Sequence, residues 1–213
     1  MHLVLHSAWR ATAPYRVRIG LALKGLAYDY GPVNLIAGEQ RGEAYRAINP
    51  QGLTPTLIAD GVVMTQSLAI LEWLEEVRPE PALLPRDPAG RAVVRAMADV
   101  VACDIHPLNN TRVGRALAGL GMSDADQRAW IHRWINDGFA TLEPMIARHG
   151  AGFCFGDQPG LADCCLAPQV YSARRFGVDL GPYPAIVAVA EQAAGHPAFA
   201  AAHPDRQPDA VPV

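Results

Sequence analysis

The sequence has few of the residues on which several classes of function depend. Its four cysteines, at positions 103, 154, 164 and 165, form no C-x-x-C pair and have no zinc-like spacing. Neither a dithiol redox centre nor a metal site is therefore expected. No run approaches the roughly 18 apolar residues of a membrane span, and the first residues lack a charged segment followed by an apolar one. We expect a cytoplasmic protein with reduced, partly buried thiols and no membrane segment.

An excess of charge of one sign is also lacking. The formal net charge is −3, so the chain has no general basic surface for nucleic acid or for an anionic membrane. Lysine is nearly absent, because Lys24 is the only lysine among 18 basic residues. The remaining basic residues are arginines, which can hold a carboxylate with two parallel hydrogen bonds. Any anion site must therefore be local and built from arginine.

What is present is enough for a folded core, since 213 residues with 50% apolar content suit one large domain or two small ones. The stretch Ser7–Leu26 predicts the end of a strand, a polar turn and the start of a helix. Leu3–Leu5 suits a short buried strand, and Pro14 suits the first helical position. The spacing of one buried helix face is found at Ile19, Ala22, Leu23 and Leu26.

This turn predicts an anion pocket. The backbone N–H groups of residues Thr12 to Arg16 would point into the turn at the positive end of the helix. Arg10 and the hydroxyl of Thr12 would lie at its rim.

The following segments continue an α/β pattern. Tyr28–Asn34 predicts a second strand, parallel to the first because a whole helix separates them. After a weakly helical segment, Asp60-Gly61 lies between two short apolar runs, which is a hairpin signal. Ser67 is a suitable N-cap for a helix over Leu68–Arg78. The order is therefore βαβ, a helical turn, ββ and a helix.

Strand patterns disappear after the proline-rich segment Pro79–Pro88. Helices are predicted over Arg91–Arg115, Asp124–His149, Leu161–Phe176 and Pro184–Ala194. Pro107 predicts a kink in the first of them. We expect an α/β domain over residues 1–78, a linker over 79–88 and an all-helical domain over 89–213.

Together these features resemble the zeta class of cytosolic glutathione transferases, whose fold joins a thioredoxin-like domain (βαβ-α-ββ-α) to an all-α domain. The similar segments are WRxxxxxRVRIGLALKGL at 9–26, NPQGLTPTL at 49–57, QSLAILEWLEE at 66–76, DIHPLNN at 104–110 and PQVYSARRFGVDLGPYP at 168–184. The class includes maleylacetoacetate and maleylpyruvate isomerases. The resemblance implies glutathione as cofactor, a homodimer and a place in aromatic amino acid catabolism.

The resemblance also implies a set of glutathione contacts. Pro55 would be a cis-proline that turns the backbone of Thr54 toward the cysteinyl part of glutathione. Gln66 and Ser67 would hold the γ-glutamyl carboxylate at a helix N-terminus. Further positions that line the site in this class are matched by Gln40, His106, Asn110 and Arg112. The alternatives are that Ser67 only caps a helix, Pro55 only begins a strand and His106 only packs at the kink.

The sequence departs from the zeta pattern at the turn, where Ser-Ser-Cys usually follows the Trp/Phe-Arg pair. Here the three positions are Ala11, Thr12 and Ala13. Thr12 is thus the one side chain left at these positions that can donate to the sulfur. The alternative is that helix-start N–H groups ionise the thiol without any hydroxyl. A second departure is Gly160 at an expected N-cap, where Asp163 can take the helix-start N–H groups instead.

The implied reaction is cis–trans isomerisation of a maleyl keto acid by reversible addition of the glutathione thiolate. Arg10 and Arg175 would hold the two carboxylates and stabilise the charge that develops, and Arg112 would add positive field. The alternative for Arg175 and its neighbour Arg174 is a helix C-terminal cap.

Two other functions stay open. One is a general glutathione transferase or dehalogenase with an apolar substrate pocket, and the other is a non-catalytic glutathione-binding protein. A thioredoxin-like oxidoreductase is disfavoured because the turn lacks cysteine. The sequence does not distinguish maleylacetoacetate from maleylpyruvate as substrate.

Overall fold

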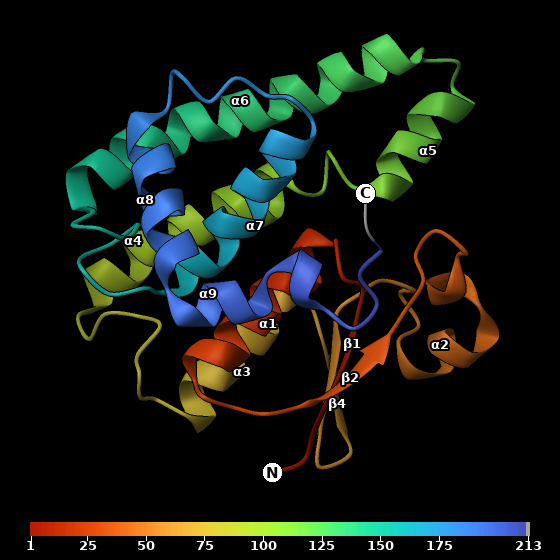
Figure 1. Ribbon diagram of the computed structural model, residues 1–213, viewed down its shortest axis with the longest axis horizontal. Coiled ribbons are helices and arrows are strands. Elements are labelled where there is room, and N and C mark those ends of the chain that lie inside the picture. Colours follow the sequence, from red (N-terminus) through yellow and green to blue (C-terminus); the bar gives the residue numbers. More distant parts are fainter. Residues whose placement is uncertain (212–213) are drawn as a thin grey trace. The chain divides into compact units, whose positions relative to one another are not determined.

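In the computed structural model, which describes residues 1–211 (Figure 1), four strands form one mixed sheet, whose order is β2-β1-β3-β4. The strands are β1 (Leu3–Ser7), β2 (Asp29–Pro32), β3 (Thr56–Ala59) and β4 (Val62–Thr65). Strand β2 is parallel to β1, whereas β3 is antiparallel to both β1 and β4. The predicted hairpin is confirmed, because Asp60 and Gly61 join β3 to β4 with φ values of 46° and 88°. Positive φ at both residues suits the right-handed twist of the flanking strands.

The chain divides into two units, Met1–Leu83 with the residues from His196 onward, and Leu84–Gly195. The first unit holds the sheet and the helices α1 (Thr12–Leu23), η1 (Glu39–Arg41), α2 (Glu43–Ile48), α3 (Ser67–Val77), α9 (Pro197–Ala202) and η3 (Pro204–Arg206). The predicted order βαβ-α-ββ-α is confirmed. The C-terminal residues join this unit because α9 packs against α1. The predicted domain bounds, with an α/β domain over 1–78, a linker over 79–88 and an all-helical domain over 89–213, stay a prediction.

Helix α1 differs from its prediction in two ways. It begins at Thr12 rather than Pro14, and its residues from Thr12 to Leu21 are all buried, whereas Ala22 and Leu23 are only half-buried. The expectation of one apolar face was wrong because α1 packs against β1, α3 and α9 at once. A Cβ at Gly20 would overlap the side chain of Leu71, so glycine lets α1 approach α3 closely.

The second unit is helical. Its helices are α4 (Pro88–Asp99), the π-helix η2 (Val100–Ile105), α5 (Thr111–Gly119), α6 (Asp124–His149), α7 (Leu161–Arg175) and α8 (Pro184–Gly195). The predicted bounds of α6 are confirmed, and those of α7 and α8 differ by one residue.

The prediction of one continuous, kinked helix over Arg91–Arg115 was wrong. The helix passes into the π-helical turn and ends at Ile105, and α5 starts anew after Asn110. Pro107 has no N–H to donate, so it cannot continue the hydrogen-bond pattern of the helix. The Asn110 side chain then accepts a hydrogen bond from the N–H of Arg112 and starts α5.

Among residues 1–211, no helix is both long and apolar enough to cross a bilayer. The cysteines are free thiols, of which Cys103 is exposed and the other three are buried.

Candidate functional site

The turn between β1 and α1 ends in a helix start that has no side-chain cap. Ala11 is the N-cap residue, with extended backbone, and Thr12 and Ala13 take the first two helical positions. The N–H groups at these positions have no acceptor within a helix. They therefore lie at the positive end of α1 and can bind an anion.

The predicted set of donors from Thr12 to Arg16 was too wide. Because α1 begins two residues early, the N–H of Tyr15 already donates to the carbonyl oxygen of Ala11 (3.1 Å), and Pro14 has no N–H. The backbone donors of the turn are thus those of Thr12 and Ala13. Thr12 is buried, with 8% of its surface exposed. Arg10 is half-buried, and its guanidinium carbon lies 4.9 Å from the centre of the Trp9 ring.

The loop before β3 is held from within the first unit. The Thr54–Pro55 peptide bond is cis, as the resemblance implied. The carbonyl oxygen of Leu53 accepts hydrogen bonds from the Tyr45 hydroxyl (2.8 Å) and from Nδ2 of Asn49 (2.7 Å). Nδ2 of Asn49 also donates to Oγ1 of Thr56 (3.1 Å). Tyr45 and Asn49, which were not predicted, therefore hold the carbonyl of Leu53, and Asn49 also holds the side chain of Thr56, on the two sides of Thr54.

Helix α3 begins one residue earlier than predicted. Gln66 is its N-cap residue, with φ of 69°, and Ser67 is its first helical residue, so Ser67 is not the cap. The Gln66 amide donates to Oε1 of Gln51 (2.8 Å), and the buried Ser67 hydroxyl accepts a hydrogen bond from Nη1 of Arg16 (3.2 Å).

Arg16 was missed because it stands inside a helix among apolar residues. It is buried, with 2% of its surface exposed, and lies one helical turn after Thr12. Its bond to Ser67 brings the first turns of α1 and α3 together. Two helix N-termini and a buried guanidinium thus make one electropositive region in the first unit.

Gln40 provides a test of whether a ligand fits this region. Its side chain is 8% exposed, and its Oε1 has no hydrogen-bond partner among the described residues. A buried oxygen of this kind needs a donor. The adjoining loop is close-packed, because a Cβ at Gly52 would lie 2.8 Å from the carbonyl oxygen of Gln40. An N–H group of a polar ligand would supply this donor, and the role of Gln40 stays a prediction.

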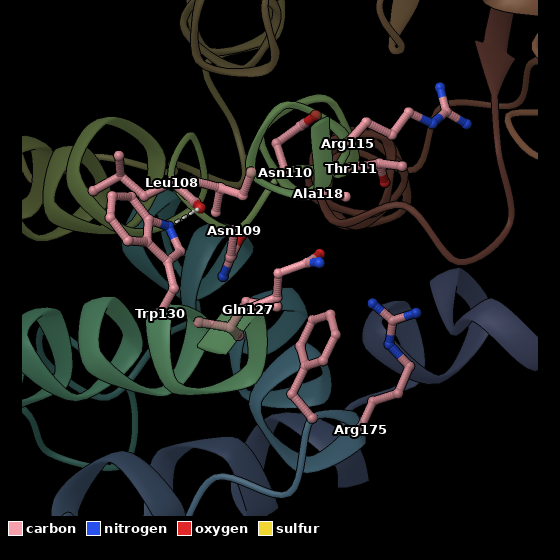
Figure 2. Close-up of a pocket in the computed structure, with 13 residues that line it drawn as sticks. Leu108, Asn109, Asn110, Thr111, Arg115, Ala118, Gln127, Trp130 and Arg175 are labelled. Carbon is pink, nitrogen blue, oxygen red and sulfur yellow. Dashed lines mark hydrogen bonds between the residues drawn. The ribbon is translucent and has the colours of Figure 1, made fainter. Parts of the chain in front are cut away.

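The other predicted site residues belong to the second unit. Asn110 and Arg175 line a pocket of about 360 Å³ with Leu108, Asn109, Thr111, Gly114, Arg115, Leu117, Ala118, Gln127, Trp130, Ile131 and Phe176 (Figure 2). His106 and Arg112 are not among the residues that line it. His106 follows the π-helix and is half-buried, and Arg112 is exposed on the first turn of α5.

The pocket has polar and aromatic groups that sequence reasoning missed. Nδ2 of Asn109 is buried and has no hydrogen-bond partner in residues 1–211, and the Trp130 indole donates to the carbonyl oxygen of Leu108 (2.8 Å). Arg175 is exposed at the end of α7, with its guanidinium carbon 4.7 Å from the centre of the Phe176 ring. Asn109 lies in the similar segment 104–110 but was not singled out there. No local pattern marked Trp130, because its contact with Leu108 forms only in the folded unit.

Comparison with known proteins gives a family match in each of the two units. Residues 13–77 match the family described as glutathione S-transferase, N-terminal domain, and residues 128–202 match glutathione S-transferase, C-terminal domain. A maleylacetoacetate isomerase of Pseudomonas aeruginosa is 52% identical over 208 residues, covering 96% of this chain and 97% of that protein.

Two solved structures extend the comparison. A holo maleyl pyruvate isomerase, described as a bacterial zeta-class glutathione S-transferase, superimposes with a TM-score of 0.96 at 47% identity and covers 98% of this chain and 100% of its own. A maleylacetoacetate isomerase from Anaeromyxobacter dehalogenans has glutathione in its active site, with a TM-score of 0.90 at 49% identity over 99% of this chain and 98% of its own.

Proposed function

The chain belongs to the glutathione S-transferase family, in its zeta class, and from this premise we propose that it is a glutathione-dependent cis–trans isomerase of a maleyl keto acid. The observation that carries the proposal is the 52% identity to a maleylacetoacetate isomerase along nearly the whole of both chains. The electropositive region at the starts of α1 and α3 suits an ionised sulfur and a carboxylate.

The first unit has groups for each part of glutathione. Ser67 and Gln66, at the start of α3, would hold the γ-glutamyl carboxylate, with the buried Arg16 adding positive charge beside Ser67. The backbone of Thr54 would pair with the cysteinyl part, and Oε1 of Gln40 would accept an N–H of the peptide.

When bound, glutathione supplies a thiolate that adds reversibly to the alkene, so that rotation about the former double bond becomes possible. The chain must keep this sulfur ionised. The N–H groups of Thr12 and Ala13 and the dipole of α1 favour the anion. Since Ala11 and Ala13 carry neither a hydroxyl nor a thiol, the Thr12 hydroxyl is the one side-chain donor among these three residues.

Arginines would hold the two carboxylates of the substrate and stabilise the negative charge that develops. Arg10 stands at the turn of the first unit, and Arg175 stands at the pocket of the second. Asn110 uses its Oδ1 to cap α5, so Nδ2 is the atom that it can offer to a ligand. Arg112 and His106 complete the proposed set.

The proposal is tested by assaying maleylacetoacetate and maleylpyruvate with and without glutathione. We expect conversion of at least one keto acid that depends on glutathione. An Arg10→Ala variant should lose about 10- to 100-fold in kcat/KM, the effect of removing a hydrogen bond to a charged group. The matched control is Arg78→Ala, which removes an exposed arginine of the same unit.

Three results would point elsewhere. Unchanged rates in Arg10→Ala would exclude the carboxylate anchor. Turnover of apolar electrophiles but of neither keto acid would indicate a general transferase or dehalogenase. Tight glutathione binding without turnover would indicate a non-catalytic binding protein.

We also propose a homodimer in the cytoplasm, with a role in aromatic amino acid catabolism. In support of the dimer, the edge strand β4 exposes Val62 and Val63, with 63% and 45% of their surfaces accessible. Apolar side chains on an exposed sheet edge favour an interface. Sedimentation analysis of the full chain tests this, and a monomer at micromolar concentration would exclude it.

A further inference from the structure

The turn that carries Arg10 is not fixed by its own sequence. Its N-cap residue Ala11 has no side chain that could accept a hydrogen bond, and one backbone bond closes the turn, from the N–H of Ala11 to the carbonyl oxygen of Ala8 (3.1 Å). The orientation of the Trp9 and Arg10 peptides must therefore depend on groups from elsewhere in the chain.

One of these groups is Arg18, which is fully buried within α1. Its guanidinium donates to the carbonyl oxygen of Trp9 (2.8 Å), to the Ser7 hydroxyl (3.0 Å) and to the carbonyl oxygen of Ala8 (3.4 Å). Its Nε donates to the carbonyl oxygen of Ala202 at the end of α9 (3.1 Å). Arg18 thus holds the carbonyl side of the turn and joins it to the C-terminal segment.

The other group is Asp209, from that C-terminal segment. Its Oδ2 accepts a hydrogen bond from the backbone N–H of Trp9 (3.0 Å), and its Oδ1 accepts one from the Tyr30 hydroxyl on β2 (2.6 Å). Burial, and next the hydrogen bond to Asp209, raise the pKa of Tyr30, so the hydroxyl stays a donor. Trp9 is therefore held at its N–H by Asp209 and at its carbonyl by Arg18, from two sides.

The C-terminal segment around Asp209 is held in place by hydrogen bonds of its own. Nε2 of the buried Gln207 donates to the carbonyl oxygens of His203 (2.8 Å) and Ala201 (3.2 Å), which ties the segment to the end of α9. The N–H of Ala210 donates to the carbonyl oxygen of Gln207 (3.0 Å) and closes a turn around Asp209. The carboxylate also supplies negative charge near the buried Arg18.

We propose that Asp209 is a positioning residue of the anion site, which acts through Trp9 and together with Arg18 sets the orientation of Arg10 and of the first turn of α1. This inference rests on the proposed function, because it concerns the same site. Fixing a reacting geometry in advance lowers the cost of reaching the transition state, and small displacements of such groups are costly. A carboxylate near the C-terminal end of the chain thereby becomes part of the machinery at its N-terminal turn.

The test compares Asp209→Ala with Asp209→Asn in the full-length protein. The alanine removes both acceptors, whereas the asparagine keeps one oxygen for the Trp9 N–H and offers an amide to the Tyr30 oxygen. Asp205→Ala is the matched control, because it removes an exposed carboxylate four residues earlier in the same segment. Four quantities are measured: the hydrogen exchange rate of the Trp9 amide, the pKa of the thiol of bound glutathione, and kcat and KM for the keto acid.

For Asp209→Ala we expect faster exchange at the Trp9 amide, a raised thiol pKa and a kcat lowered by about tenfold or more. The affinity for glutathione should change little, since Ser67 and Gln66 are untouched. Asp209→Asn should recover most of the loss, and Asp205→Ala should behave as wild type.

The proposal is overturned if Asp209→Ala lowers only the melting temperature and leaves the thiol pKa and kcat unchanged, because the carboxylate would then be merely structural. It is equally overturned if Trp9 exchange does not change. Exchange at Trp9 and the thiol pKa need no keto acid, so a wild-type protein that isomerises neither substrate would refute the proposed function without deciding this point. If Asp209→Ala fails to fold, Tyr30→Phe replaces it, because it removes the hydrogen bond that holds the Asp209 carboxylate. Faster Trp9 exchange with a raised thiol pKa in Tyr30→Phe would support the proposal, and wild-type values of both would overturn it.

Discussion

Helices α1 and α7 are each buried along most of their length, yet the charged side chains that they bury are of opposite sign. Helix α1 carries Arg16, Arg18 and, at its end, Lys24, each at most 2% exposed. Helix α7 carries Asp163, which is 1% exposed. The cations of α1 bond to other segments of its unit, whereas the carboxylate of α7 accepts the N–H groups of Gly160 and Cys154 beside its own first turn, both at 2.8 Å.

The two helix starts show what this difference means. Both lack a side-chain hydrogen-bond acceptor at the N-cap, where α1 has Ala11 and α7 has Gly160. Helix α7 supplies its own anion three residues later, so its positive end is used by the fold. Helix α1 has Pro14 at the corresponding position, and its first N–H groups stay available for an anion from outside the chain. The same local geometry thus serves stability in one unit and, in the proposed function, ligand binding in the other.

The largest expected effect concerns Lys24, the cation of α1 farthest from the anion site. Its ammonium donates to Oε2 of Glu75 (2.7 Å) and to the carbonyl oxygen of Pro81 (2.6 Å). A Lys24→Met variant removes the ammonium from this buried ion pair and should lower the free energy of unfolding by about 3–5 kcal/mol. Denaturant unfolding at pH 7 measures the loss.

Two comparisons control this prediction. Adding Glu75→Leu to Lys24→Met should recover part of the stability, because both charges are then removed. Arg133→Ala removes one partner of the exposed pair Arg133–Asp137 (3.8 Å) and should cost under about 0.5 kcal/mol. If Lys24→Met and Arg133→Ala lower the free energy of unfolding equally, then the burial of Lys24 does not contribute to stability.

The next effect concerns the carboxylate of α7. An Asp163→Asn change replaces one acceptor oxygen by an NH₂ group that faces a backbone N–H, so it should cost about 1–3 kcal/mol of unfolding free energy. Asp126 holds the same position in α6 but is exposed, and Asp126→Asn should cost less. The thiol pKa of bound glutathione should not change in either variant, which separates this helix start from that of α1.

The pH dependence of Asp163 gives an independent check. Burial raises the pKa of Asp163 to about 6 in the folded protein, against about 3.9 for an unperturbed aspartate. The folded state therefore binds the proton more tightly than the unfolded state. The stability that comes from proton binding by Asp163 is fully present below pH 4 and is lost as the pH rises to about 6. The unfolding free energy of wild type relative to Asp163→Asn should thus fall across this window, and a rise would contradict the assignment.

The sequence predicted those features whose signals are local. Asp60-Gly61 marks its hairpin without help from the rest of the chain, and the bounds of α6 follow from a continuous periodic segment. The break after Ile105 was missed because Pro107 predicts a disturbance but not a π-helical turn before it. The short helix α9 was missed for lack of length, although it covers α1.

The candidate site divides in the same way. The turn at Arg10 and Thr12 was read from the residues, whereas Thr54, Gln66 and Ser67 came only from resemblance to a family. Arg16 and Asp209 escaped both, because Arg16 bonds to a residue 51 positions away and Asp209 to one 200 positions away. A buried cation inside an apolar helix is the one signal that sequence reasoning could have used, since such a charge requires partners.

The smallest expected effect on stability is that of Ala11→Asp, a substitution that gives the start of α1 a carboxylate like that of α7. An aspartate at Ala11 would stand at the N-cap of α1 and accept the N–H of Ala13, which should raise the free energy of unfolding by about 1 kcal/mol. The added negative charge would compete with the sulfur for the same donors, so the thiol pKa of bound glutathione should rise and isomerisation should slow. Ala11→Ser is the matched control, because it caps the helix without charge and should leave the thiol pKa near or below that of wild type. If Ala11→Asp gains stability but keeps the wild-type thiol pKa, then the start of α1 serves only the fold, as that of α7 does, and the Thr12 hydroxyl is left as the group to test by Thr12→Ala.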